Sequence, residues 1–134
     1  MRKFALLIAG VGLAACAMGP QQDERVASQQ RLAQLLAGKV AGGQVQCIPD
    51  YHTSSPSVIT PDAIAFEPNT NRVYVSSTAG SGCEGVSGET YSLVTTSRGP
   101  SGLCAGDAVQ IRDLHTGVMA GACTLSPFVP YTRQ

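Results

Sequence analysis

The chain has 134 residues, with nine basic and nine acidic side chains, no Trp and three Phe. This length suits one domain rather than two, and the scarcity of large aromatic residues predicts a modest apolar core. The balanced charge, with no basic stripe along the chain, argues against a nucleic-acid partner and against binding to anionic lipid headgroups.

The first part of the chain, residues 1–15, has the organisation of a secretory signal peptide. Arg2 and Lys3 form a basic start, and residues 4–15 are apolar apart from two glycines. This run is too short to span a bilayer, which takes about 20 apolar residues. It ends in Leu13-Ala14-Ala15-Cys16, which resembles the lipobox of bacterial lipoproteins. The alternative is an ordinary signal peptide followed by an incidental cysteine.

The lipobox resemblance implies cleavage before Cys16, a diacylglycerol on its thiol and acylation of the new amine. Each buried methylene contributes about 0.8 kcal/mol, so two or three acyl chains anchor a protein stably to a membrane. The residue after the cysteine is Ala17 rather than Asp, which in double-membraned bacteria favours transfer to the outer membrane. We therefore expect a lipid-anchored protein of the cell envelope, on the periplasmic face of the outer membrane.

Residues 16–43 are expected to form the lipid anchor, a tether and one helix. Pro20 suits the first helical position, and Gly38 suits the residue that ends the helix. The apolar side of this helix consists of three leucines, Leu32, Leu35 and Leu36, together with Ala33. The pattern leaves open whether the helix packs on the following domain or holds that domain off the bilayer. Gly42-Gly43 then provide a flexible joint.

Residues 44–134 are expected to form a β domain, because apolar residues alternate there with period two. The alternation is clear in residues 63–67 and 72–76, which predicts two strands of a hairpin. The turn between them has Pro68 at its second position and an asparagine able to adopt a left-handed conformation. A short strand near residues 45–48 starts the domain.

A second hairpin is predicted near the C-terminus. Its strands cover residues 108–112 and 118–123, and its turn starts at Asp113 and leaves through Gly117. A middle strand is expected over residues 89–95. Long loops rich in Gly, Ser and Pro connect these strands, at residues 49–61, 77–88 and 96–106.

Four cysteines remain besides Cys16: Cys47, Cys83, Cys104 and Cys123. An even number in a small exported domain predicts two disulfides, and the lack of a C-x-x-C pair argues against a zinc site. Three pairings are possible. The register of the second hairpin brings Cys123 toward Cys104, which favours Cys104–Cys123 and Cys47–Cys83. The expected fold is mainly β: a small antiparallel barrel or sandwich stapled by two disulfides and preceded by one helix.

No pattern of residues in the sequence indicates catalysis, a metal or a cofactor, and we expect no enzyme. His52 and Ser54 share a polar segment, but the chain has no G-x-S-x-G motif, and a polar loop explains them better. His115 has no second histidine nearby for a metal site. Glu84 and Glu89 flank a Gly-rich loop, but nothing in their spacing requires the close approach of a paired-carboxylate hydrolase.

The aromatic residues near the C-terminus have two interpretations. Phe128 and Tyr131 lie in a segment stiffened by Pro127 and Pro130. They form a candidate partner-binding strip, since Phe and Tyr are frequent interface anchors. The alternative, favoured because cores claim scarce aromatic residues, is that Phe128 fills the domain core.

Three segments resemble the C-terminal part of a family of small bacterial envelope proteins of unknown function: Leu103-Cys104-Ala105-Gly106-Asp107, Gly121-Ala122-Cys123-Thr124-Leu125 and Phe128-Val129-Pro130-Tyr131. Cys47-Ile48 and Gly82-Cys83 fit the same family, so the resemblance covers about residues 44–131. Ser126-Pro127 departs from it, because the family more often has glycine there. The resemblance implies an exported domain with matched cysteines and carries no activity.

Two functions agree with these observations. The favoured one is a non-enzymatic envelope lipoprotein that binds another envelope protein or supports the envelope at the membrane surface. The alternative is inhibition of a secreted hydrolase, either a lysozyme or a protease, by the loop at residues 77–88.

Overall fold

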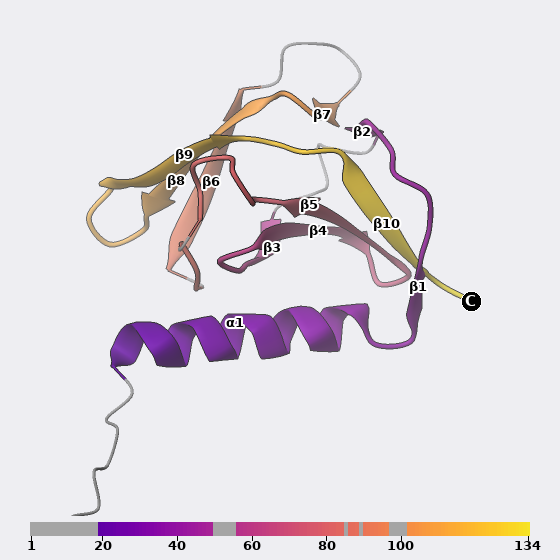
Figure 1. Ribbon diagram of the computed structural model, residues 1–134, viewed down its shortest axis with the longest axis horizontal. Coiled ribbons are helices and arrows are strands. Elements are labelled where there is room, and N and C mark those ends of the chain that lie inside the picture. The colour runs from indigo at the N-terminus through magenta and orange to yellow at the C-terminus, as the bar shows by residue number, and fades with distance from the viewer. Residues whose placement is uncertain (1–18, 50–55, 85, 89, 97–101) are drawn as a thin grey trace, which may run out of the picture.

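The computed structural model describes residues 19–49, 56–84, 86–88, 90–96 and 102–134. One helix, α1 (Pro20–Leu36), precedes the strands (Figure 1). The strands are β1 (Lys39–Ala41), β2 (Cys47–Ile48), β3 (Pro56–Ile59), β4 (Ala63–Asn69), β5 (Arg72–Ser77), β6 (Tyr91–Thr96), β7 (Leu103–Cys104), β8 (Ala108–Asp113), β9 (Met119–Thr124) and β10 (Phe128–Arg133). Within the described residues they form three antiparallel sheets that do not close. The predicted mainly β fold with one N-terminal helix and two disulfides is confirmed, and the barrel alternative is wrong.

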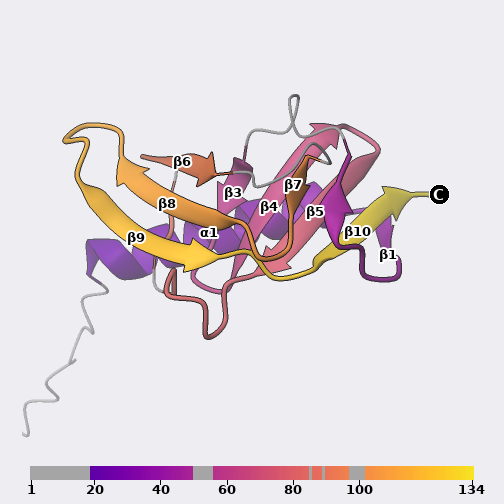
Figure 2. The ribbon, with the colours of Figure 1, turned by 90° about the horizontal axis from the view of Figure 1, so that it is seen from above.

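A five-stranded sheet with α1 on one of its faces forms the larger layer (Figures 1 and 2). Its strand order is β1-β10-β5-β4-β3, so β1 and β3 are its edges. Along β4, Ile64 and Phe66 point to one face, whereas Ala65 points to the face under α1. Both sets are buried, because the helix covers the face that would otherwise meet water.

The other face of this sheet shares an apolar core with a three-stranded sheet, β6-β8-β9, and a two-stranded sheet, β2-β7. Phe66 and Phe128 meet edge to face in this core, with their ring centroids 6.0 Å apart. Val109 and Ile111 of β8 and Leu103 of β7 pack with them. Phe128 is fully buried. Its interpretation as a core residue is therefore confirmed, and its assignment to a partner-binding strip is wrong.

The helix packs on the sheet through its C-terminal half. Its three leucines contact the buried cluster of Val58, Ala65 and Val73. The helix begins at Pro20, as predicted, and Gly38 follows its end with a φ of 73°, a conformation that glycine adopts without steric cost. Of the two arrangements that the sequence left open, the structure has the helix docked on the domain.

The hairpin of β4 and β5 is confirmed, but its turn is shorter than predicted. Pro68 belongs to β4, and a register shift between Phe66 and Asn69 accommodates it because proline has no N–H for the ladder. Asn69 lies opposite Arg72, so two residues form the turn, and the Asn71 N–H donates to Asn69 Oδ1 at 3.0 Å. No described residue other than glycine has a positive φ, so the predicted left-handed asparagine is wrong.

The hairpin of β8 and β9 has the predicted turn. The Gly117 N–H donates to the Asp113 C=O at 2.8 Å, and Gly117 has a φ of 70°. The carboxylate of Asp113 accepts from the N–H groups of Thr116 and His115, and these hydrogen bonds hold its pKa below the usual value. The turn is therefore determined by its own five residues.

The cysteine pairing differs from the favoured one. The bonds are Cys47–Cys104 and Cys83–Cys123, so the expected pairs Cys47–Cys83 and Cys104–Cys123 are wrong. The register of the hairpin also differs from the predicted one, which brought Cys123 toward Ala108: Cys123 lies opposite Val109, and the ladder shifts between Ile111 and Arg112. Strand β7 pairs with β2 and places Cys104 directly opposite Cys47. The loop after β5 folds back onto β9, which brings Cys83 to Cys123.

Four strands, β1, β3, β7 and β10, were not expected from the sequence. β10 lies inside the sheet although it contains Pro130. The Pro130 C=O accepts from the Gly42 N–H at 2.7 Å, so the proline nitrogen faces the same stretch, just beyond the end of β1. A missing N–H is tolerated at such an interruption. Gly42-Gly43 accordingly lie within the sheet, between β1 and the bridge from Val45 to Phe128.

Candidate functional site

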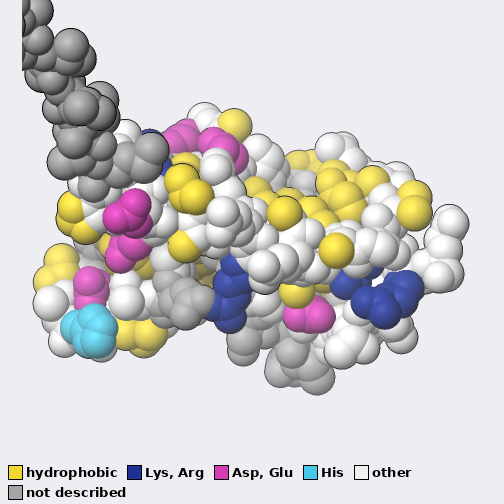
Figure 3. Space-filling model, turned by 90° about the horizontal axis from the view of Figure 1, so that it is seen from below, with side chains coloured by type: hydrophobic (Ala, Val, Ile, Leu, Met, Phe, Trp, Pro, Cys, Tyr) yellow, Lys and Arg dark blue, Asp and Glu magenta, His cyan; other side chains and the backbone are white. Residues whose placement is uncertain are grey.

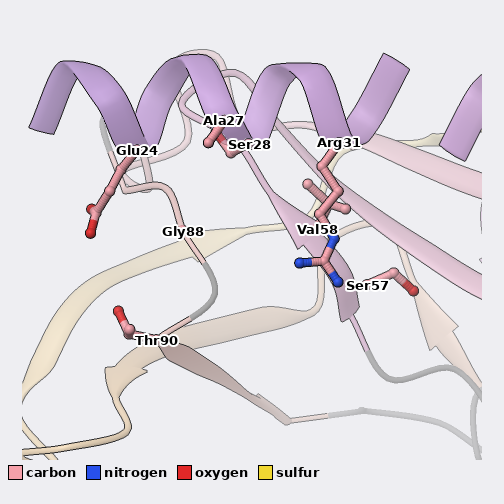
Figure 4. A pocket seen from close by; sticks show the side chains of 8 residues that line it. All are labelled: Glu24, Ala27, Ser28, Arg31, Ser57, Val58, Gly88 and Thr90. Atoms are coloured by element: carbon pink, nitrogen blue, oxygen red, sulfur yellow. The ribbon is translucent and has the colours of Figure 1, made fainter. Parts of the chain in front are cut away.

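A groove lies between α1 and the edge strand β3 (Figure 4). It has a volume of about 220 Å³ and a mostly apolar lining. The residues that line it come from α1, from β3 and from the segment before β6: Glu24, Ala27, Ser28, Arg31, Ser57, Val58, Gly88 and Thr90. We call this feature the α1 groove.

The helix contributes residues spaced three or four apart, which lie on one side of α1. Ala27 and Ser28 continue the stripe of leucines by which the C-terminal half of α1 packs on the sheet. Because alanine and serine are smaller than leucine, the N-terminal half does not fill the space above β3, and the groove opens there. The buried Ser28 hydroxyl donates to the Arg25 C=O at 2.9 Å, which leaves the wall on this side largely apolar.

The opposite wall is formed by β3, which is the last strand of its sheet. Its ladder with β4 shifts between Pro56 and Val58, so Ser57 sits at a bulge. The Gly88 N–H donates to the Ile59 C=O at 3.2 Å and covers part of the outer edge. A proline, a bulge and a covering segment are means by which sheets prevent the addition of another strand. The groove is therefore suited to an inserted side chain rather than to an added strand.

Charged groups of opposite sign lie toward the two ends of the groove. Figure 4 shows Arg31 reaching from α1 toward Ser57, while Glu24 extends from α1 at the other end. The Glu24 carboxylate lies over Gly88, where a Cβ atom would be 3.7 Å from its Oε2. From Arg31 the hollow surface continues along the β3 edge toward Tyr91. Such a pair of charges at a rim orients a partner more than it adds affinity.

The structure does not bring the residues singled out from the sequence into this groove. Phe128 lies in the core on the far face of the sheet. Tyr131 is half-buried against the cluster below α1, and His115 is exposed in the β8–β9 turn. The remaining candidates lie outside the described residues: Cys16, His52, Ser54 and Glu89.

Two of the acidic residues stabilise turns. Glu84 is exposed, and hydrogen bonds from its own backbone N–H and from Gly82 hold the pKa of its carboxyl below the usual value. The bond from the Gly82 N–H to Glu84 Oε2 measures 2.9 Å. Asp107 is buried, and its Oδ2 accepts from the Cys104 N–H at 2.8 Å. Both carboxylates thus accept hydrogen bonds from backbone N–H groups two or three residues earlier in the chain.

In the described part of the chain, no three His, Cys, Asp or Glu side chains lie close enough together to hold a metal ion. The same ranges contain no helical segment with the length and hydropathy of a transmembrane span. No protein-family model matches the chain, and no curated protein or solved structure is significantly similar to it. The two disulfides indicate an extracytoplasmic protein, because such bonds persist mainly in oxidising compartments.

The sequence contained one signal for the groove. The apolar stripe of α1 stops at Leu32, and the same side continues with Ser28 and Ala27. This change indicates a helix side that does not pack tightly. It does not reveal a groove, because β3, which forms the other wall, has no period-two pattern and was assigned to a loop.

Proposed function

We propose that this protein is a lipid-anchored component of the bacterial cell envelope that binds another envelope protein through the α1 groove and catalyses no reaction. The lipobox resemblance around Cys16 and the two disulfides support an exported, anchored protein. Ala17, next to the lipidated cysteine, supports the periplasmic face of the outer membrane.

The size and lining of the α1 groove carry the binding part of this proposal. Its volume of about 220 Å³ is below the ~300–1,000 Å³ typical of sites for drug-sized ligands and cofactors. A space of this size accommodates an inserted side chain of a protein partner. Ala27 and Val58 favour an apolar side chain of the partner in the centre of the groove. Glu24 and Arg31, at the rim, favour polar groups of the partner around that side chain. An apolar centre with a polar rim is the usual anatomy of a protein interface.

Blocking the groove tests this proposal. Ala27→Arg places a long side chain in the groove and keeps a good helix former at an exposed position. Ala33→Arg is the matched control, since Ala33 is exposed on α1 but does not line the groove. In cells that express the full chain, chemical cross-linking and mass spectrometry should recover a partner with the unaltered chain and with Ala33→Arg. Capture should be lost with Ala27→Arg.

A photo-cross-linking amino acid gives an independent readout of the same surface. At Ser57, which lines the groove, it should label the partner. At Gln110, which is exposed on β8, it should not. Equal labelling from both positions, or equal capture by both arginine variants, would show that the groove is not the binding surface.

A second candidate function, inhibition of a secreted hydrolase, is favoured by the cross-links of residues 78–84, the first part of the loop between β5 and β6. The buried Cys83 bonds this loop to Cys123 on β9, and the Glu84 carboxylate closes it onto Gly82. A rigid exposed loop loses little conformational entropy on binding, which is what insertion into an enzyme cleft requires.

The inhibitor hypothesis has a direct test. The purified full chain is assayed against a lysozyme and a secreted protease, beside Glu84→Ala, which removes the closing hydrogen bond. Inhibition by the unaltered chain that weakens in Glu84→Ala would support this function. Undiminished hydrolase activity in the presence of the unaltered chain would exclude the two enzymes as targets.

A further inference from the structure

The turn between β8 and β9 exposes three large hydrophobic side chains. Leu114, Val118 and Met119 are 61%, 64% and 54% exposed, and we call these three residues the hairpin tip. The other strongly exposed large hydrophobic residues in the described ranges are scattered over α1, β1 and β6: Val26, Val40 and Val94. Clustered exposure of this kind marks a surface that contacts a partner or a membrane, whereas scattered exposure is normal.

The backbone holds the hairpin tip in one shape. The Asp113 carboxylate accepts two N–H groups of the turn, at 2.7 and 3.1 Å, and Gly117 closes the turn onto the Asp113 C=O. The Leu114 N–H donates to the Thr90 C=O at 2.8 Å, which ties the turn to the segment before β6. These hydrogen bonds do not depend on apolar side chains at the tip. The fold therefore gives no reason for three exposed hydrophobic residues there.

The position of the tip points to the membrane. Figures 1 and 2 both show the β8–β9 turn and the beginning of α1 at the same end of the long axis of the molecule. Three residues of chain, 17–19, separate Cys16 from Pro20, so the Cα atoms of Cys16 and Pro20 are at most about 14 Å apart. Acyl chains on Cys16 therefore turn this end of the domain toward the bilayer.

We infer that the hairpin tip inserts into the interfacial region of a phospholipid bilayer, as a second contact beside the acyl chains. This inference rests on the lipid anchor of the proposed function. Most of the Asp and Glu side chains visible in Figure 3 lie toward the end at which α1 begins. Because acidic side chains repel anionic headgroups, the tip is suited to zwitterionic lipids such as phosphatidylethanolamine. With two contacts at one end, the opposite end, with β1 and β10, points away from the membrane.

A single tryptophan tests the inference, because the chain has none of its own. Val118→Trp places it in the hairpin tip. Val40→Trp is the matched control, since Val40 is also an exposed valine and lies on β1 at the other end of the molecule (Figure 1). The two lipidated proteins are reconstituted in phosphatidylcholine–phosphatidylethanolamine vesicles whose acyl chains carry bromine, which quenches tryptophan in the bilayer. We expect blue-shifted, several-fold more strongly quenched emission from Val118→Trp than from Val40→Trp.

The outcomes separate this inference from the anchor on which it rests. Equal quenching of both variants, while both float with the vesicles, would overturn the inference and leave the anchor intact. Loss of flotation in both variants would overturn the anchor and the inference with it. A blue shift of Val118→Trp without vesicles, growing with protein concentration, would assign the tip to a second copy of this chain. A shift that requires an added envelope protein would assign it to that protein. Either assignment replaces the bilayer as the occupant.

Discussion

Removing the disulfides one pair at a time tests both the pairing and its contribution to stability. The two variants are Cys83→Ala/Cys123→Ala and Cys47→Ala/Cys104→Ala. In the chain-entropy model, a cross-link between residues 40 apart contributes about 3.9 kcal/mol, and one between residues 57 apart about 4.2 kcal/mol. Chain entropy alone therefore predicts nearly equal losses in the free energy of unfolding.

Burial makes the two losses unequal. Cys83 is fully buried and Cys123 is nearly so, within the main apolar core, whereas Cys47 and Cys104 are half-buried at the β2–β7 sheet. Replacing the first pair by alanine also leaves a small cavity, which costs about 1 kcal/mol more. We predict losses of about 5 kcal/mol for Cys83→Ala/Cys123→Ala and about 4 kcal/mol for Cys47→Ala/Cys104→Ala. Since domains of this size have about 5–15 kcal/mol in total, both variants should unfold at a much lower urea concentration.

The assay combines urea unfolding, followed by circular dichroism, with a titration of free thiols in the denatured protein. Removing a bonded pair adds no free thiol. The cross-pair variant Cys104→Ala/Cys123→Ala should instead show two more free thiols than Cys83→Ala/Cys123→Ala, because it leaves Cys47 and Cys83 without their disulfide partners. No additional thiols in the cross-pair variant would refute the pairing. A smaller loss for Cys83→Ala/Cys123→Ala than for Cys47→Ala/Cys104→Ala would refute the burial argument.

Three further predictions concern single residues. Phe128→Ala should lower the free energy of unfolding by about 3–5 kcal/mol, and Tyr131→Ala by clearly less, because only Phe128 is fully buried; urea midpoints measure both. Gly82→Ala should destabilise more than Gly80→Ala, since both have positive φ but only at Gly82 would a Cβ lie 2.6 Å from a carbonyl oxygen of β9; similar urea midpoints would contradict this close contact. The N–H groups of Thr116 and His115 hold the pKa of Asp113 below its usual value. Ionised Asp113 therefore stabilises the fold at a pH above its unfolded-state pKa, and this stabilisation is lost as the pH falls through its folded-state pKa. In Asp113→Asn the urea midpoint should therefore decrease less steeply as the pH is lowered than in the unaltered chain. The same decrease in both proteins would be evidence against this role of Asp113.

The sequence by itself was sufficient for features that a few neighbouring residues determine. The helix starts at Pro20 because the ring of proline fixes φ at a helical value. It stops before Gly38 because glycine adopts the positive φ that ends the helix. The β8–β9 turn follows from Asp113 and Gly117 in the same way. Period-two alternation was enough to predict β4, β5 and β8. In β8 the alternating apolar residues form the one buried side, whereas β4 and β5 are buried on both faces. The even cysteine count predicted two disulfides.

Only the tertiary structure decided the features that depend on which distant segments meet. Cys104 bonds to Cys47 because β7 pairs with β2, and no local pattern specifies that pairing. β10 became an inner strand despite Pro130 because the neighbouring chain is interrupted opposite the missing N–H. The α1 groove exists because a helix with small residues lies over a bulged edge strand. The physical reason is common to all three. A turn or a helix end is stabilised within a few residues of chain, whereas a strand pairing, a disulfide partner or a groove depends on contacts whose energy appears only after the whole chain has folded.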